Sequence, residues 1–533
     1  MTNKVLSIAM TAIMASVASL HAQEGAYRYA DATQLWRLTA NVAGLGCDYS
    51  HDRGCAQFSL LHADGDYTRV QEGDMRNQME FFTERYQKIA QFLVGYGKFR
   101  FDMDRTKNRA WADEMRPYNA NPFISGSSVK GRYDAQNFDL TAALSTMPIP
   151  LAGGTDREMT IGVRLDYQVG DLSRLRDPRS RSQLLDYRLT PAATYTFARS
   201  TAGLAAYYER RKEKVPNMTT VQEDPNLVYY LMTGMEQATG TIGGYKGFSR
   251  EWVNHELGAE LSYQYRDARI NSLNAATLAR GVEDTWGNYK YEPGRYTSYI
   301  YKVSSLNRLR QGRLLHQLDL HADITEAFAD EYRQQLVQER DADKGYTSYR
   351  YETQIAYKKR YQVKTADIGL HYRLNAVGGL SADPAVGGQS ADAGSTAVTA
   401  YLGAAATLQG ATNKHLLPAS QLKYQRLCLT LEGGHALLRD RLWLDADITY
   451  SSAPKADLCL TDATTAYAQQ VLMADMAYYD ARYWQGSLAL TYLFPLSLKD
   501  TRSTWYVRAY GDGLKASGSQ ERYLVGCTIG LYY

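Results

Sequence analysis

The sequence predicts an all-β chain that forms a transmembrane antiparallel β-barrel of about 14 strands (roughly 12 to 16), with long extracellular loops. Three observations support this fold class. Apolar and polar residues alternate with a period of two in segment after segment, and the chain ends on such a segment. Beyond residue 22, no stretch holds about 18 consecutive apolar residues without charges. Without helices, only a closed barrel satisfies every backbone polar group in lipid.

The first 22 residues have the pattern of a secretory signal peptide. Lys4 provides a basic start, and the apolar stretch from Val5 to Leu20 is shorter than the ~20 residues of a spanning helix. We expect cleavage after Ala22. The first cysteine, Cys47, lies far beyond that site, which argues against a lipid anchor there. The expected organisation is therefore a signal peptide (1–22), a periplasmic N-terminal segment (23–55) and the barrel (56–533).

The alternation is clear in the internal segment Met159–Gly170, where Ile161 and Val163 oppose Thr160 and Arg164. A soluble β-sandwich would also alternate, but aromatic residues at segment ends and uneven connections favour a barrel. The alternating segments are Tyr96–Asp104, Met159–Gly170, Glu256–Arg266, Gln317–Thr325, Thr365–Leu374, Arg441–Tyr450, Tyr483–Phe494 and Trp505–Asp512. The expected long loops are Arg211–Gly244, Asn271–Gly294 and Ser451–Ala481.

The last eleven residues form the clearest predicted strand. Their apolar face resembles the closing strand of bacterial outer-membrane barrels, in which the terminal aromatic residue is part of the signal read by the barrel-assembly machinery. The resemblance implies outer-membrane lipid as the surroundings and that machinery as a partner. The residues of this expected assembly signal are Tyr523, Val525, Cys527, Ile529, Leu531 and Tyr533.

Composition narrows the class of protein further. The chain has 43 Tyr against 12 Phe and 7 Trp, and tyrosine suits both strands and the aromatic girdles of barrels. A net charge of +3 from 60 basic and 57 acidic residues gives no indication of nucleic-acid binding. Among the five cysteines, Cys47 and Cys55 bracket a short polar loop and are a possible disulfide pair. A metal site using His51 and Asp48 is a weaker interpretation of the same loop.

The alternation also predicts which charged side chains face the lumen. Residues of both signs argue against strong ion selectivity, and most are expected to pair with one another across neighbouring strands. The expected lumenal residues are Lys98, Arg100, Arg164, Asp166, Arg373, Asp445, Asp447 and Arg508. A further lumenal group combines carboxylates with imidazoles, which are ligands for transition metals, although a salt-bridged wall is the preferred interpretation. These weak metal candidates are Asp319, His321, Asp323, Asp367 and His371.

The usual catalytic motifs are missing from the sequence. The stretch from His255 to Ala259 begins like a zinc-protease helix but lacks the second histidine and has the period of a strand. No G-x-S-x-G nucleophile elbow occurs. A Ser-His-acid set stays open, because such triads are recognised by geometry. We expect no enzyme activity and no cofactor.

Several short stretches resemble a family of uncharacterised outer-membrane β-barrels from Bacteroidota, known only as a domain of unknown function. The matching stretches are His21-Ala22-Gln23, Gly65-Asp66-Tyr67, Gln71-Glu72-Gly73-Asp74, Phe81-Phe82-Thr83-Glu84-Arg85-Tyr86, Gly95-Tyr96-Gly97-Lys98-Phe99 and the aromatic C-terminus. The resemblance implies that the chain accompanies TonB-dependent uptake systems, with a TonB-dependent receptor or a surface lipoprotein as partner. No catalytic residues are known for the family.

The expected function is a channel or accessory component of nutrient uptake, with iron as one candidate nutrient and loops 211–244 and 451–481 as ligand-capturing segments. The alternative is a surface-exposed binding or structural barrel, with a blocked lumen and long loops that dock a partner protein.

Overall fold

The structure is a computed structural model that describes residues 24–50, 52–151, 156–216, 218–221, 227–242, 248–340, 347–379, 396–438, 441–498 and 501–533. The expected signal peptide and His51 lie outside the described residues. In the described part of the chain, no helix is long and apolar enough to cross a membrane.

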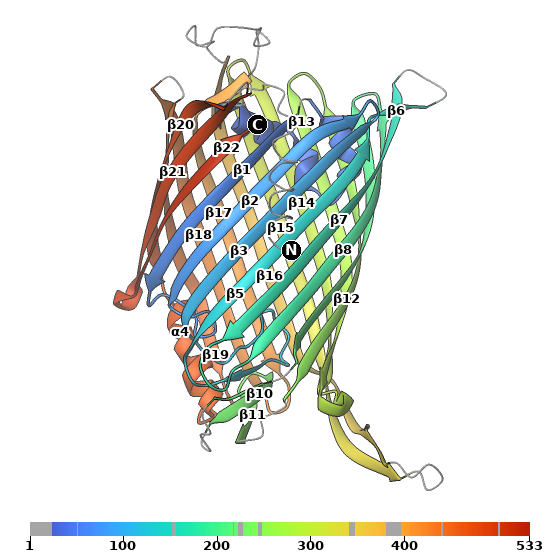
Figure 1. The fold of residues 1–533 in the computed structure, drawn as a ribbon, viewed down its shortest axis with the longest axis vertical. Coiled ribbons are helices and arrows are strands. Elements are labelled where there is room, and N and C mark those ends of the chain that lie inside the picture. Colours follow the sequence, from blue (N-terminus) through green and yellow to red (C-terminus); the bar gives the residue numbers. More distant parts are fainter. Residues whose placement is uncertain are drawn as a thin grey trace.

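Nineteen strands hydrogen-bond into one antiparallel sheet, and 18 of them form a closed barrel (Figure 1). The two-residue strand β6 (Ile149–Pro150) lies outside the ring and pairs only with β7. The first half of the ring consists of β1 (Arg53–Gly65), β2 (Met75–Ala90), β3 (Leu93–Arg109), β5 (Gly131–Thr146), β7 (Arg157–Arg174), β8 (Arg181–Phe197), β9 (Ser200–Val215), β12 (Arg250–Arg266) and β13 (Ile270–Gly287).

The second half of the ring returns to β1. It consists of β14 (Gly294–Gln311), β15 (Leu314–Arg340), β16 (Thr347–Gly379), β17 (Thr396–His415), β18 (Ser420–Leu437), β19 (Leu442–Cys459), β20 (Tyr483–Leu498), β21 (Thr501–Ala516) and β22 (Glu521–Tyr532). Strand β22 pairs with both β21 and β1, which closes the barrel without a free edge.

The predicted number of about 14 strands is therefore wrong, and the described residues form 18 barrel strands. Two errors contribute to the difference. Residues 271–294, expected as a loop, mostly form β13, which pairs with β12 and β14. Strands β9 and β17 carry small residues on both faces, as in Ala202–Ala206 and Gly403–Ala406, so their sequences lack the alternation that identifies a strand.

The outer face of the barrel is apolar and the inner face is polar. On β12, Leu257 and Leu261 are each 65% exposed on the outside, whereas Glu256 and Glu260 on the inside are 8% and 5% exposed. Because a continuous exposed apolar surface is costly in water, this wall is suited to contact with lipid. The other outward apolar residues include Phe138, Leu140, Ile161, Val163, Leu204, Val303, Leu429, Leu431, Leu488, Leu490, Val507 and Val525.

The two ends of the barrel differ. At one end, here the short-turn end, the strands are joined by tight connections such as 198–199 and 312–313. The chain terminus, Tyr533, lies at this end beside the start of β1 (Figure 1). The opposite end, here the long-loop end, carries the long connections 110–130, 216–249 and 460–482. Exposed aromatic rings of Tyr195, Phe197 and Tyr492 lie near the short-turn end, as expected of an aromatic girdle.

Short elements occupy the interior and the long-loop end. The N-terminal segment contains α2 (Glu24–Thr33), η1 (Leu35–Leu38), η2 (Val42–Gly44) and α3 (Leu45–Asp48). The long connections contain a small sheet of β4 (Ser125–Ser127), β10 (Val228–Gly234) and β11 (Gln237–Ile242), together with η4 (Ala468–Leu472) and α4 (Met473–Tyr479). Two short connections at the same end contain η3 (Asn288–Lys290) and η5 (Ser517–Ser519).

The C-terminal tyrosine stabilises the seam, which is the pairing of the first strand, β1, with the last, β22. The Tyr533 backbone N–H donates to the Gly54 carbonyl oxygen at 3.0 Å, and its hydroxyl lies 3.1 Å from the Thr83 hydroxyl on β2. The Arg85 guanidinium lies 5.4 Å from the centroid of the Tyr533 ring. Tyr533 therefore links β22 to both β1 and β2.

We expect Tyr533→Ala to reduce the fraction of chain that folds into a closed barrel, because the seam loses its side-chain contacts with β2. The measurement compares unheated with boiled membrane fractions on a denaturing gel, where a folded barrel migrates differently until it is boiled. Gly513→Ala is the matched control, since a Cβ at Gly513 meets nothing within 4 Å. An equal folded fraction in Tyr533→Ala and Gly513→Ala would exclude this role for the terminal ring.

Candidate functional site: the barrel lumen

Residues 24–48 lie inside the barrel and cross it at the short-turn end. Arg28 donates two hydrogen bonds of 2.8 Å to Asp445 on β19. The Trp36 indole N–H donates to Gln264 on β12 at 2.8 Å. On the opposite side, the Ser145 hydroxyl of β5 donates to the Ala43 carbonyl oxygen at 2.8 Å. One short segment thus contacts walls that are far apart around the ring.

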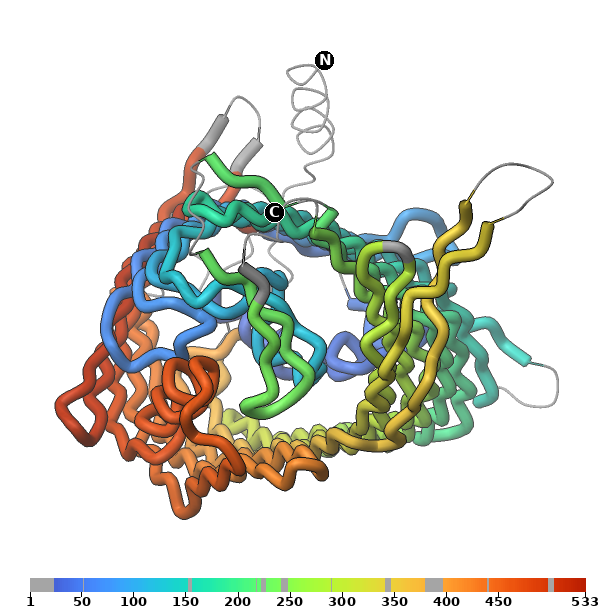
Figure 2. The backbone as a smooth tube through the Cα atoms, turned by 90° about the horizontal axis from the view of Figure 1, so that it is seen from below, coloured from blue at the N-terminus to red at the C-terminus, as the bar shows by residue number. Residues whose placement is uncertain are grey.

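Apolar packing supports these polar contacts. Leu35 and Trp36 are fully buried against Leu273 of β13 and Leu306 of β14. The turn η2 packs against β5, β7, β8 and β9. Figure 2 looks into the barrel from the long-loop end and shows this segment (dark blue) within the ring of strands. Residues 24–48, which fall within the expected periplasmic segment 23–55, thus lie in the barrel interior.

The long-loop end is crossed by a second layer, residues 110–128. The Trp252 indole N–H on β12 donates to the Phe123 carbonyl oxygen at 2.8 Å, and the Met115 N–H donates to Glu213 on β9 at 2.6 Å. Phe123 is 1% exposed and packs against Ala329 of β15 and other residues of that wall. The β10 strand joins this layer by pairing with β4 (Figure 2).

The layer contains buried carboxyl groups with raised pKa values. Burial, followed by the repulsion of the Glu213 carboxylate, raises the pKa of Glu114 to about 8. Its Oε1 accepts from the Ser125 backbone N–H at 2.7 Å, whereas Oε2 is buried without a partner. In helix α4, burial raises the pKa of Asp475 to about 6, although hydrogen bonds from Tyr118 and the Val70 N–H oppose this. Protonation is therefore coupled to the packing of this end.

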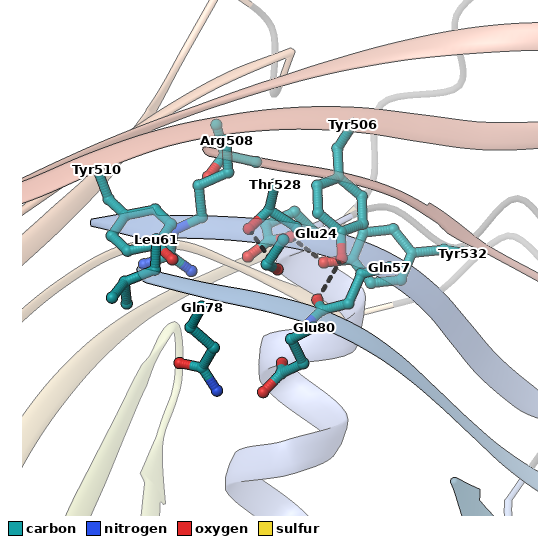
Figure 3. Close-up of a pocket in the computed structure, with 12 residues that line it drawn as sticks. Glu24, Gln57, Leu61, Gln78, Glu80, Tyr506, Arg508, Tyr510, Thr528 and Tyr532 are labelled. Atoms are coloured by element: carbon teal, nitrogen blue, oxygen red, sulfur yellow. Dashed lines mark hydrogen bonds between the residues drawn. The ribbon is translucent and has the colours of Figure 1, made fainter. Parts of the chain in front are cut away.

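Two adjoining polar cavities lie along the wall between the two layers. The first, of about 310 Å³, is lined by residues of β1, β2 and β20–β22 and by Glu24 (Figure 3). The second, of about 510 Å³, extends along β2, β3, β5, β7, β8 and β9. Gln57 and Glu80 line both cavities. Ligand cavities commonly have volumes of about 300–1,000 Å³, so each is large enough for a small solute.

The structure brings four of the eight expected lumenal residues together. Lys98, Arg100, Arg164 and Asp166 all line the second cavity, where Arg164 and Asp166 form an ion pair of 2.8 Å. Arg508 lines the first cavity.

The other three expected lumenal residues contact different partners. Arg373 pairs with Glu432 at 2.7 Å. Asp445 binds Arg28, and Asp447 accepts from the Ser487 hydroxyl. None of these three residues lines either cavity, although Asp445 and Asp447 lie on β19, which pairs with β20 beside the first cavity.

The five weak metal candidates are divided among separate pairs. His321 lies 3.1 Å from Asp367, while His371 lies 2.7 Å from Glu432. Asp319 pairs with Arg308, and Asp323 lies 3.9 Å from Lys302. In the described residues, no three His, Cys, Asp or Glu side chains are grouped to hold a metal ion.

The expected disulfide is not formed, and Cys47 and Cys55 are both free thiols. The Cys47 sulfur lies 3.7 Å from the Thr194 hydroxyl of β8, whereas the Cys55 sulfur lies 3.6 Å from the Tyr27 hydroxyl. The interior path of the N-terminal segment carries Cys47 to the β8 wall, while Cys55 stays on β1. Closeness in sequence is therefore not closeness in space here.

Sequence reasoning missed several residues of the cavities. Glu80, Asp139, Asp186, Arg188 and Glu209 line the second cavity, on strands whose alternation is weak or interrupted. Strand β8 contains Pro191, and β9 has charges on both faces near its end. The signal that could have found them is strand pairing, since Asp139 lies directly opposite Arg100.

The closed ring, apolar outer wall and polar lumen define a membrane-type β-barrel. The chain belongs to a family of unknown function, DUF6850, whose model matches residues 42–533. No curated protein sequence matches this chain.

Three solved structures show the range of similar barrels. The FrpB iron transporter of Neisseria meningitidis is 9% identical, with a TM-score of 0.37 over 92% of this chain and 83% of that chain. The outer-membrane protein OpdK of Pseudomonas aeruginosa is 10% identical, with a TM-score of 0.34 over 90% and 99%. The siderophore receptor PiuA of Acinetobacter baumannii is 10% identical, with a TM-score of 0.35 over 91% and 82%. Similarity at this level carries no information on ligand or partner.

The raised pKa of Glu114 predicts that the layer 110–128 loosens as the pH rises. A buried carboxyl with a raised pKa holds its proton in the packed state, so its stabilising contribution is complete below about pH 4.5 and is lost as the pH approaches about 8. Hydrogen exchange of the amides in residues 110–125, corrected for intrinsic rates, should show falling protection over this range. Glu114→Gln should weaken the dependence.

Glu339→Gln serves as the control. It makes the same chemical change as Glu114→Gln, but on the exposed extension of β15. Equal pH dependence in wild type and Glu114→Gln would contradict the assignment to Glu114.

Proposed function

We propose that the protein is an outer-membrane channel for a small polar nutrient, and that residues 24–48 close its periplasmic end. Barrels of 16 to 18 strands are wide enough to hold an aqueous channel. The short-turn end is assigned to the periplasm, because outer-membrane barrels have short turns there and longer loops outside the cell. The apolar outer wall supports placement in the membrane.

One observation carries the proposal: residues 24–48 bind the lumen wall through side-chain hydrogen bonds and ion pairs as well as through apolar packing. Arg28 to Asp445 and Trp36 to Gln264 are examples. Water can replace these polar contacts when the segment moves. The segment is thus suited to a closure that can be released.

A second candidate function is a surface binding barrel with a permanently blocked lumen. This alternative is favoured because chain segments cross the barrel at both ends. Residues 24–48 and residues 110–128 each contact several strands of the wall. In that case the long-loop end docks a partner protein. A TonB-dependent receptor or a surface lipoprotein as partner, and iron as the nutrient, stay predictions.

Releasing the N-terminal segment should open the channel. In Arg28→Ala/Trp36→Ala, the segment loses its ion pair with β19 and its buried ring, and each loss costs the docked state about 3 kcal/mol. Single-channel conductance in planar bilayers should rise several-fold over wild type. Leu38→Ala is the matched control in the same segment, because Leu38 is 60% exposed.

The gel assay on the same preparations shows that each barrel is folded. Absence of conductance in a folded double variant would favour the blocked binding barrel. Full conductance in wild type, unchanged in the double variant, would show that residues 24–48 do not close the lumen.

A further inference from the structure

The first cavity, on the wall between β20 and β2, has features of a ligand site beyond those of a polar channel wall. Its volume is about 310 Å³. Figure 3 shows Arg508 and Tyr510 on one side, Tyr506 and Tyr532 on the other, and Gln78 and Glu80 across from them. The side chains come from β1, β2, β20, β21, β22 and α2, so the barrel and the N-terminal segment build the cavity together.

The acidic groups of the cavity already have partners. Glu24 binds Arg28 at 2.7 Å and accepts from the Tyr532 hydroxyl. Glu80 lies 2.8 Å from Arg100, which lines the second cavity. The negative charge of both carboxylates is therefore balanced from outside the first cavity.

The positive group of the cavity has no such partner. The Arg508 Nε–H is buried without a hydrogen-bond partner, and no ion pair among the described residues includes this side chain. The nearby carboxylate of Asp445 is held by Arg28 and by the Tyr401 hydroxyl. The Arg508 guanidinium lies 5.9 Å from the centroid of the Tyr510 ring and has no carboxylate partner in the described part of the chain. Such a group favours a carboxylate ligand, since its N–H groups match the two oxygens.

The neutral groups of the cavity are suited to hydroxyl groups. The Thr491 hydroxyl is buried without a partner, although buried polar groups are normally hydrogen-bonded. The Tyr506 hydroxyl donates to Gln57 Oε1 at 2.7 Å, which leaves the amide nitrogen of Gln57 as a donor. The side chains of Tyr506 and Tyr532 stack with ring centroids 4.9 Å apart and present an apolar surface beside these groups.

We propose that this cavity binds a small hydroxylated carboxylic acid of the size of a monosaccharide acid. Arg508 binds the carboxylate, and Gln57, Gln78 and Thr491 bind hydroxyl groups. The proposal names the nutrient class of the channel and rests on the proposed function only for the claim that the ligand is transported.

The test is equilibrium binding of D-glucuronate, D-glucose and acetate to the detergent-purified full-length barrel by calorimetry. We use wild type and Trp36→Ala, which loosens the docking of residues 24–48 but keeps Arg28, the partner of Glu24 and Asp445 beside the cavity. Glucuronate should bind more tightly than either glucose or acetate, because only glucuronate uses both the guanidinium and the hydroxyl-binding groups.

Arg508→Gln should weaken glucuronate binding about tenfold or more, since a hydrogen bond to a charged group is lost. It should leave glucose binding unchanged. Arg508→Lys keeps the charge but not the paired N–H geometry, so its glucuronate affinity should lie between those of wild type and Arg508→Gln. Lys302→Gln is the control, because it removes a cation from β14, half-way round the barrel, where Lys302 lies near Asp323.

Acetate binding as tight as glucuronate binding would reduce the cavity to a simple anion site and overturn the proposal. So would unchanged glucuronate binding in a folded Arg508→Gln barrel, or no glucuronate binding in either background. Conductance distinguishes failure of the proposed ligand from failure of the proposed channel. An open channel without glucuronate binding rejects the nutrient class alone. Glucuronate binding without conductance rejects the transport role alone.

Discussion

The closed ladder of backbone hydrogen bonds is the constraint on which the rest of the structure depends. In lipid, an unpaired backbone group costs several kcal/mol, so the sheet has to join its own first strand. Strands β1 and β22 meet this requirement in an unbroken register from Cys55 opposite Tyr532 to Gly65 opposite Arg522. The terminal tyrosine then binds Gly54, just before the first of these pairs. Every residue of the wall is thereby fixed as outward or inward.

The second consequence is a polar inner wall that needs partners of its own. Charged groups that face one another across strands pair where they can, as in Arg100 with Glu80 and Arg373 with Glu432. The N-terminal segment satisfies others, with Arg28 between Glu24 and Asp445 as the clearest example. The segment that fills the lumen thus also neutralises charges on its wall. Other buried polar atoms stay without a hydrogen-bond partner, and Arg508 Nε is one of them.

The two layers of chain across the lumen have different chemistry. Residues 24–48 are held at the short-turn end by ion pairs and hydrogen bonds together with the buried ring of Trp36, whereas residues 110–128 bury Glu114, whose pKa is raised to about 8, at the long-loop end. Opening of the two ends is for this reason expected to respond to different conditions. The cavities between them would be reached from one side at a time, which is compatible with both a gated channel and a ligand-binding barrel.

The sequence alone determined the class of fold, because lipid on one side and water on the other impose alternation wherever side chains differ strongly. Segments such as Met159–Gly170 and the terminal strand were identified on that basis. It did not determine the strand number, since β9 and β17 carry small residues on both faces and give no alternation. It indicated charged positions such as Lys98 and Arg508 but not which of them meet.

Pairing between strands decided the composition of each cavity, and the folding of residues 24–48 into the lumen decided which charges stay free. The second of these depends on contacts between residues hundreds of positions apart, as with Arg28 and Asp445, separated by 417 positions. Local patterning carries no information on such contacts. The sequence therefore determined the wall, and only the tertiary structure decided what fills it.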